Sequence, residues 1–275
     1  MSSAFYPPPL LEPEQLQSSL ADPAILIVDL SDPGRYAAGH IPGAVRLDYS
    51  ELILGIPPAP GLLPDAAQLG AVLSRIGLTS DQHVIAYDAE GNGRACRLLW
   101  TLVTLGHSRL SLLNGGIQAW EAAGGPLEAG SRLPTASAYR AQFDDPPTAI
   151  ADRAYILKRL GQPDLALVDT RTPAEYAGLD VRAARGGHIP GAVNFTWTDA
   201  MDPHRQLRLQ PAPVLRQLLD RRGVTLDKEV IVYCQTHHRS AHTYWVLRSL
   251  GYARVRGYPG AWSEWGNDPG LPVET

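Results

Sequence analysis

Cysteine is scarce in this sequence, and several other absences exclude whole classes of protein. Cys96 and Cys234 are the only two cysteines among 275 residues, too few for a disulfide framework. The net charge is −4 and no run of basic residues occurs, so the charge pattern gives no support to nucleic-acid binding. No apolar run is long enough to span a bilayer, so we expect no membrane segment.

The N-terminal stretch MSSAFYPPPLLEPEQ has none of the features of a secretory signal. It lacks a basic flank and a long apolar core, and three consecutive prolines interrupt it. We therefore expect a cytoplasmic protein. Hydrophobic residues make up 44% of the chain and charged residues 19%, which is typical of a globular protein with a sizeable core.

An internal repeat organises the chain. Residues 25–45 (ILIVDLSDPGRYAAGHIPGAV) have a counterpart in residues 165–193. Both stretches have an apolar run that ends in an aspartate, then a tyrosine, and then HIPGAV. The second copy carries the insertion GLDVRAARG before this motif, and residues 83–128 match 229–274 without a gap. Two long copies predict two similar domains rather than a solenoid. We expect a first domain at 1–130, a linker at 131–150 and a second domain at 151–275.

Short apolar runs alternate with segments of helical period in both copies. Runs such as ILIVDL and VIAYD are apolar throughout, which is typical of strands covered on both faces. The sequence therefore predicts an α/β fold, in which each of two similar domains has a mainly parallel sheet with helices on both faces.

Cys234 stands where the chemistry of such a fold is expected. It ends the apolar run VIVY and precedes a helix that begins near Arg239 or Ser240, so the loop CQTHHR lies at the carboxyl edge of a sheet and at a helix N-terminus. Free N–H groups there favour an anion, and the cationic side chains of Arg239, His237 and His238 lower the pKa of a thiol. The loop sequence contains no acidic residue. We interpret Cys234 as a reactive nucleophile rather than a buried structural cysteine.

Cys96 has the opposite surroundings. It lies within the amphipathic segment GRACRLLWTLVTLG, where packing is the expected role of a cysteine. Asp88 occupies the position of Cys234 in the first copy, and a carboxylate cannot replace a thiolate nucleophile. We expect the first domain to be catalytically silent.

A metal site is an alternative interpretation of the same loop. Cys234, His237, His238 and His242 are ligand types, and the last two histidines are four residues apart. No second cysteine pair supports zinc, and a metal would occupy the N–H groups of the loop. We predict no metal.

Two motifs carry a resemblance to a known family. GHIPGA occurs in both copies, and GYPGAWSEW lies near the C-terminus. With the Cys234 loop, these motifs make the chain similar to the tandem-domain rhodaneses, the thiosulfate:cyanide sulfurtransferases, over nearly its whole length. The loop CQTHHR resembles that of a bacterial subgroup.

The resemblance implies a mechanism and a set of site residues. Cys234 takes sulfane sulfur from thiosulfate, becomes a persulfide without any cofactor, and passes the sulfur to cyanide or a small thiol. It implies substrate contacts from the residues Gln235, Thr236, His237, His238, Arg239, Ser240, Arg171 and Trp197. We expect a monomer, and we expect Asp169 to be structural because Asp29 occupies the same place in the silent copy. Gln235 and Thr236 replace the Arg-Lys pair of vertebrate thiosulfate enzymes, and the absence of glycine from the loop argues against mercaptopyruvate as donor.

Two other functions remain open. A persulfide carrier that delivers sulfur to a protein partner would use the same chemistry with a different acceptor. A Cdc25-like phosphatase would use Cys-x5-Arg, whereas the spacing from Cys234 to Arg239 is Cys-x4-Arg. The shorter loop suits a single sulfur atom better than a tetrahedral phosphate.

Overall fold

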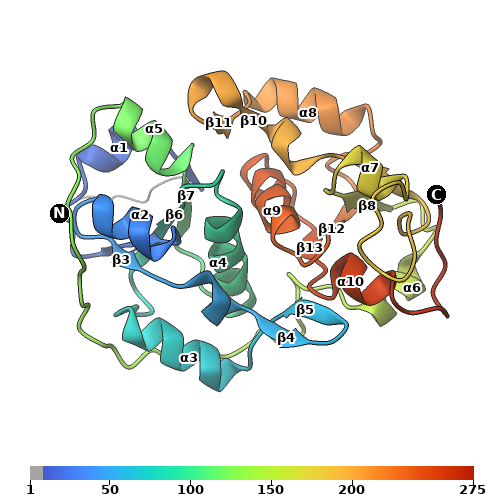
Figure 1. Cartoon of the computed structure of the whole chain (residues 1–275), viewed down its shortest axis with the longest axis horizontal. Coiled ribbons are helices and arrows are strands. Elements are labelled where there is room, and N and C mark those ends of the chain that lie inside the picture. The colour runs from blue at the N-terminus through green and yellow to red at the C-terminus, as the bar shows by residue number, and fades with distance from the viewer. Residues whose placement is uncertain (1–8) are drawn as a thin grey trace. The chain divides into compact units, whose positions relative to one another are not determined.

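The structure is a computed structural model that describes residues 9–275 (Figure 1). It contains two large parallel β-sheets, one in each half of the chain. Residues 1–8, which include part of the N-terminal stretch examined for a signal, lie outside the described residues. The first sheet has the strand order β1-β7-β6-β2-β3, with β1 Leu10–Leu11, β2 Ile25–Asp29, β3 Val45–Arg46, β6 His83–Tyr87 and β7 Leu110–Leu113. The second has the order β13-β12-β8-β9, with β8 Leu165–Asp169, β9 Ala192–Asn194, β12 Glu229–Tyr233 and β13 Val255–Gly257.

Helices follow the strands in both halves of the chain. The helices of the first half are α1 Pro13–Gln17, α2 Pro33–Ala38, α3 Ala66–Arg75, α4 Gly93–Thr104 and α5 Gly116–Ala122, with the 3-10 turn η1 at Tyr49–Leu52. Those of the second half are α6 Arg153–Arg159, α7 Pro173–Tyr176, α8 Ala212–Asp220, α9 Arg239–Ser249 and α10 Ala261–Trp265, with the 3-10 turns η2 at Trp197–Ala200 and η3 at Pro203–Arg205. Within the described range, every helix is too short or too polar to cross a membrane.

The central strands explain why the sequence pattern predicted this fold. Every residue of β6 and of β12 is buried, as continuous apolar runs require when helices cover both faces of a sheet. All strand pairs in the two large sheets are parallel. The predicted α/β class with two similar, mainly parallel domains is confirmed.

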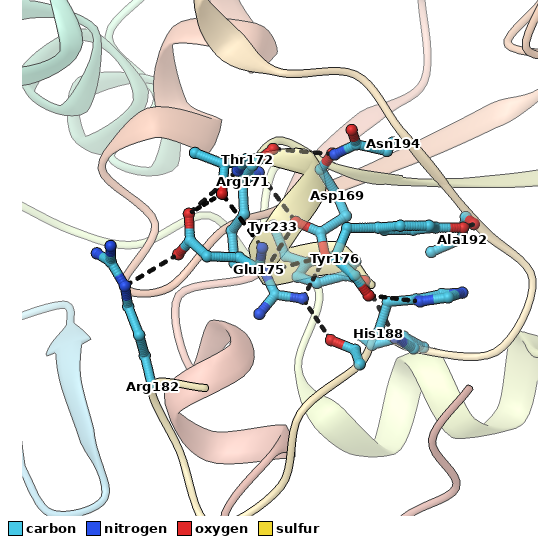
Figure 2. Close-up of polar contacts among 12 residues, drawn as sticks. Asp169, Arg171, Thr172, Glu175, Tyr176, Arg182, His188, Ala192, Asn194 and Tyr233 are labelled. Atoms are coloured by element: carbon cyan, nitrogen blue, oxygen red, sulfur yellow. Dashed lines mark hydrogen bonds and ion pairs between the residues drawn. The ribbon is translucent and has the colours of Figure 1, made fainter. Parts of the chain in front are cut away.

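The repeated HIPGAV motif has a structural role in both copies. The rings of Tyr176 and His188 stack with centroids 3.7 Å apart, and the His188 Nδ1–H group donates a hydrogen bond to the Tyr176 carbonyl at 2.9 Å (Figure 2). Tyr36 and His40 repeat the stack at 3.8 Å. Because the same stack occurs in the copy whose matching loop has Asp88 in place of the cysteine, the motif maintains the fold rather than the chemistry.

The two structural units depart from the contiguous ranges expected from the repeat. Unit 1 consists of 1–52, 64–144 and 202–209, whereas unit 2 consists of 53–63, 145–201 and 210–275. The hairpin of β4 (Leu54–Ile56) and β5 (Ala59–Leu62) therefore lies within the first repeat in sequence but belongs to unit 2. The segment 202–209 contains β11 (Arg208–Leu209) and most of the connection from β10 (Met201–Asp202). It lies within the second repeat in sequence but belongs to unit 1.

Candidate active site

Cys234 follows β12 and precedes α9 in unit 2. The loop 234–238 thus connects the carboxyl end of a central parallel strand to a helix N-terminus, the position that the sequence predicted. The residue is buried and only 1% exposed. Its backbone carbonyl accepts a hydrogen bond from Trp262 N–H of α10 at 2.9 Å, which ties the loop to a second helix.

The surroundings of the Cys234 sulfur stabilise a thiolate. Burial alone raises the pKa of the thiol, but the charge of Arg239, the hydroxyl and N–H of Ser240 and the N–H of Thr236 outweigh it. The pKa of Cys234 is therefore held below its ordinary value. The charge of Arg239, the Ser240 hydroxyl and the N–H groups of Ser240 and Thr236 all favour the ionised thiol, so the site can stabilise negative charge on sulfur.

Gln235 anchors the start of the loop. Its Nε2 group donates to the Arg182 carbonyl and to Ser263 Oγ, both at 3.0 Å, while Ser263 N–H donates to the Gln235 carbonyl at 3.1 Å. Ser263 and Arg182 were not identified from the sequence. Arg182 lies on the insertion that distinguishes the second copy, and its side chain is 54% exposed.

The loop histidines differ in their environments. His237 is fully buried with a φ of 55°, and its Nδ1 forms a 2.8 Å hydrogen bond with Ser240 Oγ. His238 is half-buried, and its ring lies 6.2 Å from the ring of Trp197, which also meets His242 edge-on at 5.5 Å. Burial, followed by the charge of His238, lowers the pKa of His242 to about 4, so this ring is neutral at pH 7.

Glu175 is the most informative residue that the sequence analysis missed. Both oxygens of this fully buried carboxylate accept from Arg239, at 2.6 and 2.8 Å. Glu175 also forms a capping box with Thr172 at the start of α7, and Arg182 lies 3.7 Å away (Figure 2). Burial raises its pKa, but the hydrogen bonds from Arg239 and Thr172 prevail and lower the pKa to about 2. Thr-x-x-Glu signals a helix start, yet nothing in it identifies a partner 64 residues away.

Arg171 lies in a different environment from that expected of a substrate ligand. Its Nε and one terminal nitrogen bind the Asp169 carboxylate at 2.5–3.0 Å, and the same terminal nitrogen donates to the Gly187 carbonyl at 2.7 Å (Figure 2). The guanidinium also covers the Trp262 ring at 4.5 Å, and the residue is 1% exposed. A buried cation that is already paired is poorly placed to meet a dissolved anion. We reinterpret Arg171 as a residue that joins the end of β8 to the Gly187 carbonyl and to the ring of Trp262.

The matching loop of unit 1 contains a carboxylate in place of the thiol. Asp88 is fully buried, and its two oxygens accept hydrogen bonds from four backbone N–H groups at 2.7–3.0 Å, those of Glu90, Asn92, Arg94 and Ala95. The loop of the first copy thus also directs backbone N–H groups at an anion, and this anion is the carboxylate of Asp88. Cys96 is buried in α4, where desolvation and then the charge of Asp88 raise the pKa of its thiol well above the ordinary value. The thiol therefore stays protonated, which agrees with a packing role.

The described residues do not place the possible ligands of the alternative metal site around a common point. Among residues 9–275, no group of three or more histidine, cysteine, aspartate or glutamate side chains is arranged to hold a metal ion. The Nδ1 of His237 is engaged with Ser240, and Trp197 lies against His238 and His242.

Comparisons with known proteins agree with this architecture. The model of the rhodanese-like domain matches twice, at residues 12–123 and 152–268. A thiosulfate sulfurtransferase of Azotobacter vinelandii is 48% identical over 97% of each chain, and the sulfur carrier protein TtuD of Thermus thermophilus is 32% identical over 98% of this chain and 97% of its own. The crystal structure of SseA from Escherichia coli, described with the 3-mercaptopyruvate sulfotransferases, is 29% identical, covers 93% of this chain and 99% of its own, and superposes with a TM-score of 0.83. The chain therefore belongs to the rhodanese family, with two rhodanese-like domains of which only the second carries a cysteine in its loop.

Proposed function

We propose that the protein is a sulfurtransferase that takes sulfane sulfur from thiosulfate and carries it on Cys234. The observation that carries the proposal is the convergence of Arg239, Ser240 and the Thr236 N–H on one buried sulfur, which lowers the pKa of the thiol. A thiolate is the attacking form of cysteine, and the same donors stabilise the negative charge of a persulfide.

The reaction has two halves. The Cys234 thiolate attacks the outer sulfur of thiosulfate, a sulfur–sulfur bond forms, and sulfite leaves with the electron pair of the broken bond. Cyanide or a thiol then attacks the terminal sulfur of the persulfide and restores the Cys234 thiolate. No cofactor is needed, because the cysteine itself carries the sulfur through both halves.

We assign the substrate contacts to the loop rather than to Arg171. The N–H groups of Thr236 and Ser240 hold the transferred sulfur, and Trp197 with His238 forms one wall. Arg239 acts on the sulfur through its charge, because its terminal nitrogens are held by Glu175. This pairing also argues against a phosphatase, since the arginine of such a loop must be available to bind phosphate oxygens.

A protein thiol is the second candidate acceptor. The similarity to the sulfur carrier protein TtuD favours it. The first half-reaction is the same with either acceptor, so only the release of sulfur differs. We also propose a cytoplasmic location, since a reducing compartment keeps Cys234 available as a thiol.

The test is to load the protein with thiosulfate and measure its intact mass. We expect one added sulfur atom on Cys234, which cyanide removes as thiocyanate. Cys234→Ser abolishes loading and turnover, whereas Cys96→Ser, the matched control at the other cysteine, retains both. A wild-type protein that gains no sulfur, or a folded Cys96→Ser variant that is inactive, would overturn the assignment.

A further inference from the structure

The β4–β5 hairpin and the Cys234 loop contact the same helix. The hairpin belongs to unit 2, where β5 packs against α10 (Figure 1). The first residues of α10 bind the loop, because Trp262 N–H donates to the Cys234 carbonyl and Ser263 N–H to the Gln235 carbonyl. A segment encoded about 170 residues before the cysteine, and within the silent repeat, is therefore part of the surroundings of the sulfur-transfer site.

Gly61 approaches the loop more closely than any side chain allows. A Cβ atom added at this position would lie 2.2 Å from the Thr236 carbonyl oxygen, 2.8 Å from its carbonyl carbon and 3.1 Å from its Cα. These atoms are backbone and cannot rotate aside as a flexible side chain would. The φ of Gly61 is not in the left-handed region, so this position requires glycine for space rather than for torsional freedom.

The same hairpin contains a glycine with no such neighbour. Gly55 lies in β4, also outside the left-handed region, and a Cβ there would meet nothing within 4 Å. The two positions share the hairpin, the residue type and the freedom from torsional strain. They differ in whether they touch the Cys234 loop.

Thr236 links this contact to the sulfur. Its N–H is among the groups that lower the pKa of Cys234, two residues earlier in the loop, and its carbonyl is the group that Gly61 covers. We infer that Gly61 is a positioning residue of the sulfur-transfer site, which seats the Thr236 backbone so that its N–H points at the Cys234 sulfur. The inference rests on the proposed function for its biological meaning, but the positioning itself concerns only the thiol.

The experiment compares Gly61→Ala with Gly55→Ala in the full chain. The readout is the rate at which iodoacetamide alkylates Cys234 as a function of pH, followed by mass spectrometry, with turnover of thiosulfate and cyanide measured in parallel. We expect Gly61→Ala to raise the midpoint of the alkylation profile by about one pH unit and to lower kcat about tenfold, because a donor to the thiolate is displaced. Gly55→Ala should match the wild type in both.

A merely structural role gives a different result. It would lower the melting temperature of Gly61→Ala while the alkylation midpoint stayed at the wild-type value, and that outcome overturns the inference. A shift of equal size in Gly55→Ala would also overturn it, because the effect would then belong to the whole hairpin rather than to the contact.

A second variant covers the case in which Gly61→Ala does not fold. Replacing residues 54–62 by a Gly-Ser loop of equal length keeps the space above Thr236 but removes the strand that covers it. We expect a raised alkylation midpoint and faster amide hydrogen exchange in the loop 235–240. A wild-type midpoint in this variant overturns the inference. Because alkylation uses no sulfur donor, these results stand even if thiosulfate proves not to be the substrate.

Discussion

The Arg239–Glu175 pair allows the charge that activates Cys234 to be tested separately from the charge that holds the loop in place. Arg239 lies close enough to Cys234 for each to shift the pKa of the other, and the thiolate and Glu175 both raise that of the guanidinium. Arg239→Gln removes the cation, and Glu175→Gln removes its partner. The double variant removes both charges and leaves two side chains that can hydrogen bond to each other.

The expected shifts follow from the sign of each charge. A neighbouring opposite charge moves a pKa by about 1–3 units, so Arg239→Gln should raise the alkylation midpoint of Cys234 by roughly 1–2 units. At pH 7 this lowers the thiolate fraction, and with it the alkylation rate, by up to about a hundredfold. Glu175→Gln removes a negative charge from the region, so the midpoint should fall. The fall should be below about one unit, because Glu175 contacts Arg239 rather than the sulfur.

Stability separates the two effects. Arg239→Gln leaves the buried Glu175 carboxylate without its bidentate partner, which costs about 3–5 kcal/mol of unfolding free energy. The double variant removes the orphaned charge, so it should regain most of this stability while its alkylation midpoint stays raised. Alkylation rates across pH and urea unfolding curves of all three variants give the two quantities independently. An unchanged midpoint in a folded Arg239→Gln protein would refute the view that this arginine activates the thiol.

Two further predictions concern the buried carboxylates of Glu175 and Asp88. Because the pKa of Glu175 is lowered from 4.5 to about 2, its ionised form stabilises the fold above pH 4.5, and this stability disappears as the pH falls through about 2. The difference in unfolding free energy between wild type and Glu175→Gln should therefore shrink by roughly 3 kcal/mol between pH 5 and pH 2, and a constant difference in acid titrations would contradict the depressed pKa. Asp88→Ala leaves four backbone N–H groups of unit 1 without their acceptor, so it should destabilise the protein by about 2–5 kcal/mol in urea unfolding while sulfur transfer at 25 °C stays at the wild-type rate. Equal stability would show that the carboxylate does not hold the silent loop together.

Local patterns in the sequence determined much of this protein. Continuous apolar runs identified the central strands because strands covered on both faces need no polar alternation. The same patterns located Cys234 at a strand end and a helix start, and this position already implies free N–H groups and a thiolate. The aspartate in the matching loop identified the silent copy, since no side-chain chemistry other than that of cysteine carries sulfur there.

Tertiary structure decided which charges remain available in the site. The sequence analysis placed both Arg171 and Arg239 in the substrate site, yet Arg171 is buried against Asp169 and Arg239 is held by Glu175. The role of each arginine depends on the carboxylate that it meets. Asp169 is two residues from Arg171 in the sequence, whereas Glu175 is 64 residues from Arg239 and comes within 3 Å of it only in the folded chain. Sequence patterns report hydrogen bonding and burial within one element, whereas the partner of a buried charge is set by the packing of several elements.

The exchanged hairpin has the same explanation. Nothing in ILGIPPAPGLL indicates that residues 53–63 belong to the unit of the second repeat, because the pattern of a short hairpin does not specify the surface that it covers. Gly55 and Gly61 are likewise indistinguishable as letters in the sequence. Only the tertiary structure separates them, since the distance from Gly61 to the Thr236 carbonyl depends on the packing of β5 against α10, and the requirement for glycine is a consequence of that distance.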